Sequence, residues 1–111
     1  MDYMRMLRLL TINDEHFGEE AVWRARSPKL PAKTRALARV AALAAVGGAV
    51  PSYGAEVDAA ISGGASADEI VEVLLDIVSV VGLPCVVAAA PNLALALGYD
   101  IDDALEKPSA R

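Results

Sequence analysis

The chain has 111 residues, of which 55% are hydrophobic and only 5% aromatic, and its formal net charge is −5. This length fits a single domain that buries roughly two thirds of its unfolded surface. The basic residues between Arg24 and Arg39 are spread over a loop and one helix edge. That spread argues against a nucleic-acid partner, which requires a concentrated basic footprint.

Much of the hydrophobic content is alanine, the residue with the highest helix propensity. We therefore expect closely packed helices with more apolar surface than one small copy covers, and hence a homo-oligomer. The single cysteine, Cys85, cannot form an internal disulfide, which suits a cytoplasmic protein, and the N-terminal residues do not resemble a signal peptide. Residues 77–99 are uncharged, but Gly82, Pro84 and Pro91 interrupt them, so two buried helical pieces fit better than a membrane span.

The N-terminal quarter of the chain gives the weakest signals. Residues 1–12 are apolar without clean periodicity, and we expect an arm that packs on a neighbouring copy. Asn13 is a suitable N-cap for a short helix that contains His16, the only histidine. We expect His16 to face solvent rather than to act as a catalytic base. After a linker, Pro31 or Ala32 opens the next helix.

Glycine pairs and one capping box mark the central boundaries. The glycines at 47–48 terminate the helix that begins at Pro31 or Ala32. The next helix is expected to begin at Pro51, with Ser52 as its N-cap, and to end at the glycines at 63–64. In residues 66–69 (SADE), the serine hydroxyl and the glutamate carboxylate are spaced to bond each other's backbone amides. This capping box predicts a third helix start.

The helix after the capping box is apolar on two sides, with a narrow polar stripe at Glu69, Glu72, Asp76 and Ser79. Such a helix lies at the centre of a fold or forms half of a subunit interface. A last helix is expected to begin at Pro84 and to be kinked by Pro91. Since no segment alternates like a strand, the sequence predicts an all-α, compact bundle of about five to six helices.

Four segments together resemble the carboxymuconolactone decarboxylase family, which includes the alkylhydroperoxidase D-like proteins. They are residues 30–37 (LPAKTRAL), 56–61 (EVDAAI), 63–70 (GGASADEI) and 80–84 (VVGLP). In order and spacing the resemblance covers about residues 14–97. It implies an all-α domain, and we expect one helical domain over 1–111, with an arm at 1–12 and a tail at 106–111. It also implies assembly into trimers or hexamers, with sites near the subunit contacts.

The resemblance does not extend to the family's redox motif. Redox members share a Cys-x-x-Cys-x-x-x-His string, because two adjacent thiols must form a disulfide during peroxide reduction. At this spacing the cysteine positions fall on Ala49 and Ser52, and the histidine position falls on Glu56. Cys85 lies far along the chain, so the chain is not a dithiol peroxidase. Decarboxylase-type members lack the cysteines but keep the histidine, and this chain has Glu56 at that position. We therefore expect a degenerate site.

Four residues remain as candidates for chemistry or binding. Glu56 is either a proton carrier or an acid favoured by the helix dipole, and Tyr53, three residues earlier, is its expected neighbour on the helix surface. Tyr53 is either a hydrogen-bond donor to substrate or a wall residue. Ser52 and Cys85 are further substrate-binding candidates, with an N-cap and a small buried residue as their structural alternatives. One histidine and one cysteine do not form a metal site.

The sequence therefore leaves two hypotheses. The first is a non-redox protein that binds a small metabolite or serves in assembly. The alternative is a cofactor-free lyase or isomerase that acts on a small organic acid or lactone and uses Glu56 for proton transfer. Both predict a cytoplasmic homo-oligomer, a trimer or hexamer, with a small organic ligand, no cofactor, no nucleic acid and no membrane partner.

Overall fold

The computed structural model describes residues 3–12 and 28–99, which form five α-helices and no strand. The helices are α1 (Tyr3–Thr11), α3 (Ala32–Val46), α4 (Val50–Ser62), α5 (Ala67–Val81) and α6 (Leu83–Ala96). The predicted all-α fold is thus confirmed. The short helix expected after Asn13, with His16, and the tail at 106–111 lie outside the described residues. Among the helices described, none is long and apolar enough to cross a membrane.

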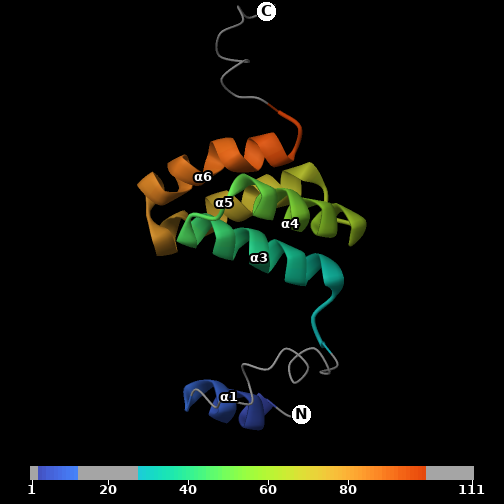
Figure 1. Cartoon of the computed structure of the whole chain (residues 1–111), viewed down its shortest axis with the longest axis vertical. Helices are drawn as coiled ribbons and strands as arrows, with labels where there is room; N and C mark the ends of the chain where they lie inside the picture. The colour runs from blue at the N-terminus through green and yellow to red at the C-terminus, as the bar shows by residue number, and fades with distance from the viewer. Residues whose placement is uncertain (1–2, 13–27, 100–111) are drawn as a thin grey trace, which may run out of the picture.

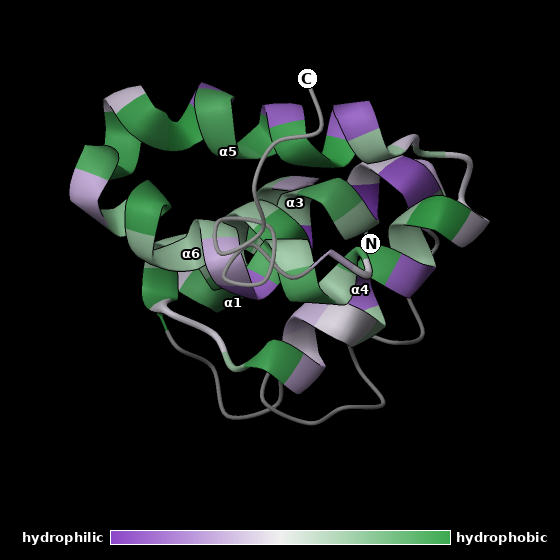
Figure 2. Cartoon of the chain, turned by 90° about the horizontal axis from the view of Figure 1, so that it is seen from above, coloured by the Kyte–Doolittle hydropathy of each residue, from purple (hydrophilic) through white to green (hydrophobic). Residues whose placement is uncertain are grey.

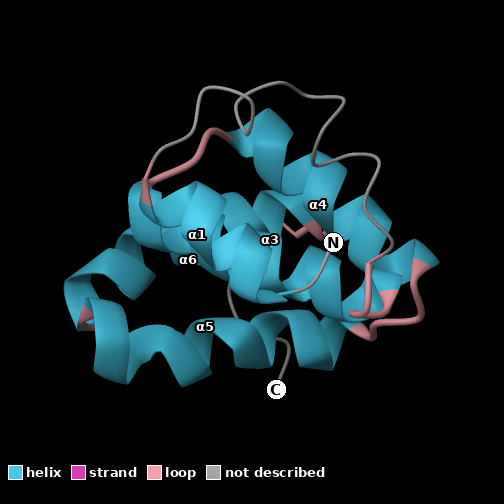
Figure 3. Cartoon of the chain, turned by 90° about the horizontal axis from the view of Figure 1, so that it is seen from below, coloured by secondary structure: helices cyan, strands magenta, loops and turns pink. Residues whose placement is uncertain are grey.

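Helices α3 to α6 form a bundle in which successive helices run in opposite directions (Figure 1). The most extensive contact joins α3 to α4, and the least extensive joins α4 to α5. Seen from below, α5 extends along one side of the bundle (Figure 3). As a result, the end of α3 and the starts of α4 and α6 meet at one end of the bundle, and the starts of α3 and α5 meet at the other.

The core of the bundle is built mostly from small and branched aliphatic side chains. Its fully buried large side chains are Tyr53, Ile70, Leu93, Val40 and Val57. Alanines at 36, 44, 60 and 89 are buried between them, and their small side chains allow the helix axes to approach closely. Apart from Tyr53, whose ring carries a hydroxyl, no polar or charged residue is buried in the described part of the chain.

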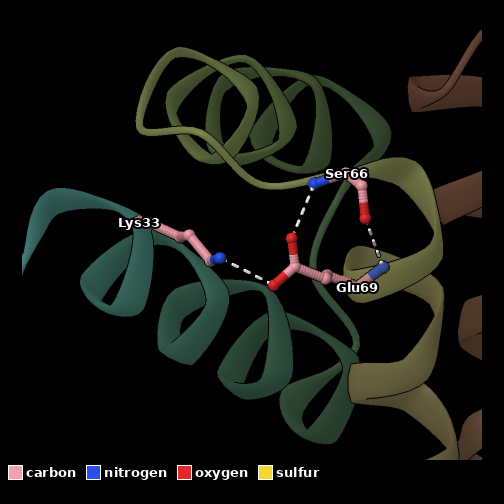
Figure 4. A network of polar contacts seen from close by, with 3 residues as sticks. All are labelled: Lys33, Ser66 and Glu69. Atoms are coloured by element: carbon pink, nitrogen blue, oxygen red, sulfur yellow. Dashed lines mark hydrogen bonds and ion pairs between the residues drawn. The ribbon is translucent and has the colours of Figure 1, made fainter.

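Most helix boundaries follow the predicted signals. Gly47 adopts a left-handed conformation with φ of 81°, and its N–H donates to the Leu43 carbonyl. Ser66 and Glu69 make both bonds of the capping box, at 3.0 and 3.1 Å (Figure 4). The prediction of Ser52 as an N-cap is wrong. Helix α4 begins at Val50 with Ala49 as its N-cap, because Pro51 has no N–H and fits within the first turn.

One further segment differs from the expectation, and another agrees with it. Residues expected to form an arm without helical periodicity form α1, which contacts none of the other described helices (Figure 1). Pro91 lies inside α6, and the helix continues beyond it to Ala96.

Helix α5 covers the core with only one of its apolar sides. Ile70 and Leu74 are buried, whereas Leu75 is 68% exposed and Val80 is 84% exposed. Figure 2 shows hydrophobic residues along most of α5. The sequence predicts α5 either at the centre of the fold or in a subunit interface. Within one chain α5 is not central, since one of its apolar sides is exposed.

Candidate functional site

The tight turn between α3 and α4 brings together the residues at the family's motif positions. Ala49 caps α4, and Ser52 and Glu56 follow in the first two turns of that helix. Both Ala49 and Ser52 are exposed, and Glu56 is partly buried. The side chains at these positions are a methyl, a hydroxyl and a carboxylate, so the turn offers hydrogen-bonding and charged groups in place of sulfur.

Glu56 forms an ion pair with a residue that the sequence did not single out. The Nε of Arg39 donates to Oε2 of Glu56 at 2.5 Å across the α3–α4 interface. The guanidinium is half-exposed, and the carboxylate side chain is 23% exposed. Among the described residues the two terminal nitrogens of Arg39 have no partner. The pair thus fixes Arg39 through one nitrogen and leaves its outer edge free to bind.

A pocket of about 390 Å³ opens beside this ion pair. Arg39, Ser52 and Glu56 supply its polar groups, and its remaining lining consists of Ala42, Leu43, Val46 and Ala55. Mostly apolar walls with a few polar groups are typical of small-molecule sites, and the volume lies at the small end of their range. The pocket therefore has the size and chemistry to hold a small molecule with one polar end.

Tyr53 and Cys85 lie at a different cavity, of about 290 Å³, between the end of α3, the start of α4 and α6. The Cys85 thiol donates to the Ala44 carbonyl at 3.2 Å, which satisfies one of the carbonyls left unpaired at the end of α3. Tyr53 has no exposed surface, and its hydroxyl has no hydrogen-bond partner among the described residues. Burial, with a smaller contribution from Cys85, raises the pKa of the Tyr53 hydroxyl above its ordinary value.

The four predicted site residues are thus divided between two pockets. Ser52 and Glu56 line the first, and Tyr53 and Cys85 line the second. The expectation that Tyr53 and Glu56 are surface neighbours is wrong, because Tyr53 is fully buried. Residues three apart on a helix point 60° away from each other, which here is enough to direct Tyr53 into the core and Glu56 toward the first pocket.

Two polar residues that line these pockets were not singled out from the sequence, Arg39 in the first and Asn92 in the second. A signal for Arg39 was present, since it precedes Gly47 by as many residues as Glu56 follows Gly48. Residues equidistant from the turn of an antiparallel helix pair lie at the same level along the two helices. Asn92 lies seven residues after Cys85, which is two helical turns along the same face.

The described residues contain no group of three or more histidine, cysteine, aspartate or glutamate side chains that could hold a metal ion. Lys33, Ser66 and Glu69 form the other polar network of the bundle (Figure 4). This network lies at the opposite end, where α3 and α5 begin, and lines neither pocket. The chemistry available near the family's motif positions is therefore that of one ion pair and one hydroxyl.

The model of the carboxymuconolactone decarboxylase family matches residues 14–94. The chain therefore belongs to the carboxymuconolactone decarboxylase family, as its sequence resemblance and its helical fold indicate. Comparisons with curated proteins and with solved structures give no significant match.

Proposed function

We propose that this chain binds a small organic acid in the pocket beside Arg39 and Glu56, without redox chemistry. The observation that carries the proposal is the open pocket of about 390 Å³ whose charged groups are the Arg39–Glu56 pair. A purely structural subunit has no need for such a pocket and would be expected to fill it with side chains. Tyr53, the largest side chain nearby, points elsewhere.

The polar end of the ligand follows from the geometry of Arg39. A guanidinium has five N–H donors in a planar fork that matches a carboxylate. Glu56 accepts from Nε, which leaves the terminal nitrogens for a second carboxylate. The Ser52 hydroxyl lines the same pocket and offers one further donor. The apolar lining suits a short hydrocarbon or ring on the other end of the ligand.

The alternative is a cofactor-free lyase or isomerase in which Glu56 transfers a proton. Glu56 and Ser52 share the pocket, which supports this alternative. One Glu56 oxygen already accepts from Arg39, so proton transfer would require a substrate to replace that bond. Binding without turnover is therefore the simpler function.

Calorimetric titration with hexanoate and benzoate tests the proposal. Arg39→Gln should weaken binding roughly tenfold or more, because hydrogen bonds to charged groups are worth about 1.5–3 kcal/mol. Arg8→Gln is the matched control, since it makes the same charge change on α1, outside the pocket. No saturable binding of either acid, or equal affinity in the Arg39→Gln variant, would contradict the proposal.

The same titration separates binding from catalysis. Glu56→Gln should still bind the acids, since the amide oxygen accepts from Arg39 as the carboxylate does. If the bound acid is consumed by the wild-type protein and left intact by Glu56→Gln, the alternative holds. If neither protein consumes it, binding is the function.

We further propose that the protein is a homo-oligomer, a trimer or hexamer, in a reducing cytoplasm. Exposed Leu75 and Val80 on α5 and exposed Val87 on α6 support the oligomer, since apolar side chains gathered on adjacent helices mark contact surfaces. Cys85 as the only cysteine supports the compartment.

A further inference from the structure

We propose that the cavity lined by Tyr53, Cys85 and Asn92 is a second binding site, for a small uncharged molecule that carries a carbonyl oxygen. The cavity lies between the last turn of α3, the first turns of α4 and one face of α6, and holds about 290 Å³. It is distinct from the Arg39–Glu56 pocket in position and in chemistry, and the proposal does not rest on the function of that pocket.

The unpartnered hydroxyl of Tyr53 is the first observation. Its oxygen is buried, and no described residue accepts its proton or donates to it. Nearly all buried polar groups in proteins have a partner, and leaving one without costs about 1–3 kcal/mol. Tyr53 is one of the residues that line the cavity, so a molecule held in the cavity is the partner that we propose for the hydroxyl. A carbonyl oxygen accepts the O–H directly.

The other polar groups of the cavity lie on α6. Cys85 and Asn92 lie two turns apart, and Ala88 and Ala89 line the space between them. The Cys85 thiol already donates to the Ala44 carbonyl, so it supplies no second proton. The Asn92 side-chain amide offers a donor and an acceptor. Tyr53 and Asn92 can thus bind opposite polar edges of one small molecule.

The absence of charge from the cavity lining determines the charge of the ligand. None of the residues that line it is acidic or basic, and an ion placed there would lose hydration without gaining a counter-charge. Burial also raises the pKa of Tyr53, so the phenol remains a neutral donor well above neutral pH. Val46 lines both pockets and stands between the charged site and the uncharged one.

The probes are 2-pyrrolidinone and cyclopentanone, two small neutral carbonyl compounds, with cyclopentylamine as the charged comparison. The side-chain amide resonances of Asn92 should shift saturably with the two carbonyl compounds and not with the amine. Bound probe should also slow alkylation of Cys85, the only cysteine in the chain. Failure of both carbonyl compounds to give saturable shifts would overturn the proposal.

Variants identify the site. Tyr53→Phe should weaken 2-pyrrolidinone binding about tenfold through loss of one hydrogen bond to a buried donor, whereas Tyr99→Phe, which alters a tyrosine outside the cavity, should not. Ala88→Leu should abolish binding by filling the cavity at an exposed helical position. Arg39→Gln should leave 2-pyrrolidinone binding unchanged, because Arg39 does not line this cavity. Failure of this proposal is therefore distinguishable from failure of the organic-acid site.

The thermal stability of the unliganded Tyr53→Phe protein gives an independent test. If the hydroxyl has no partner in the empty protein, removing it should leave the Tm unchanged or raise it. With saturating 2-pyrrolidinone the wild type should gain more in Tm than the variant. A lower Tm for unliganded Tyr53→Phe would mean that a bound water or a protein group already satisfies the hydroxyl, and the proposal would be wrong.

Discussion

The Lys33 ammonium lies 2.7 Å from one carboxylate oxygen of Glu69, while the other oxygen of that carboxylate accepts the Ser66 N–H at 3.0 Å (Figure 4). One side chain therefore completes the capping box of α5 and joins it to the first turn of α3. Helices α3 and α5 are not adjacent in the sequence, so this carboxylate joins the N-termini of two helices that no turn connects.

Acid should weaken this link at a pH set by Glu69. The hydrogen bond from Lys33, with that from Ser66, lowers the pKa of Glu69 below its ordinary value of 4.5. A group whose pKa is lowered by folding stabilises the native state above its unfolded pKa, and the stabilisation is lost as pH falls through the folded pKa. Urea denaturation of wild type and Glu69→Gln should therefore differ at neutral pH and converge in acid. The same difference should shrink in high salt, because the pair is partly exposed.

Glu72→Gln is the control for acid unfolding, since it removes a carboxylate from the exposed stripe of the same helix. It should leave the pH dependence of the wild type in place. Equal pH profiles for the wild type and Glu69→Gln would contradict the assignment to Glu69.

Gly63 should tolerate no side chain, although its backbone conformation permits one. A Cβ there would lie 2.7 Å from the backbone nitrogen of Lys33 and 2.9 Å from its Cα. Backbone cannot move aside as a flexible side chain can, so Gly63→Ala should lower the free energy of unfolding by about 1–3 kcal/mol. Urea denaturation measures the change.

Gly54→Ala is the matched substitution and should have the opposite sign. Gly54 lies within α4, and a Cβ there meets nothing within 4 Å. Replacing a helical glycine by alanine should therefore raise stability by about 0.5–1 kcal/mol. Equal losses of stability at Gly54 and Gly63 would mean that close approach to Lys33 does not explain the effect at Gly63.

The helix boundaries were predictable where a local signal decides them. The capping box at Ser66 and the glycines after α3 and α4 involve groups a few residues apart, and the structure has them as expected. At Pro51 and Ser52 two local preferences compete, and the preference of proline for the first turn prevails over that of serine for the cap. The steric reason for Gly63 depends on α3, thirty residues earlier, and no local pattern contains it.

The sequence selected four candidate residues that line the two pockets, but it missed Arg39 and Asn92 and did not give the grouping. Sequence spacing selected Glu56 and Tyr53 together, but which face of α4 is buried depends on where α3 and α6 lie. Tyr53 faces the cavity against α6, and Glu56 faces Arg39 on α3. The separation into two pockets is thus a property of packing, whereas the sequence alone shows that the chain has a single cysteine and hence no dithiol.

Arg39→Gln should change stability little while affecting ligand binding. The Arg39–Glu56 pair is partly exposed, and such pairs contribute about 0–1 kcal/mol. Urea denaturation should therefore give nearly the wild-type free energy of unfolding. A loss of several kcal/mol would mean that the pair is structural, and reduced acid binding by this variant would then report on folding.

The exposed side of α5 should determine the state of assembly. Leu75 is 68% exposed, so a charge there leaves the core of a single copy intact, but within a subunit contact it would be buried without a partner. Light scattering coupled to size-exclusion chromatography should give a trimer or hexamer for the wild type and a smaller species for Leu75→Glu. Ser79→Glu adds the same charge on the polar stripe of α5 and should keep the wild-type mass. A monomeric wild type would contradict the oligomer, and an unchanged Leu75→Glu assembly would place the contact on another face.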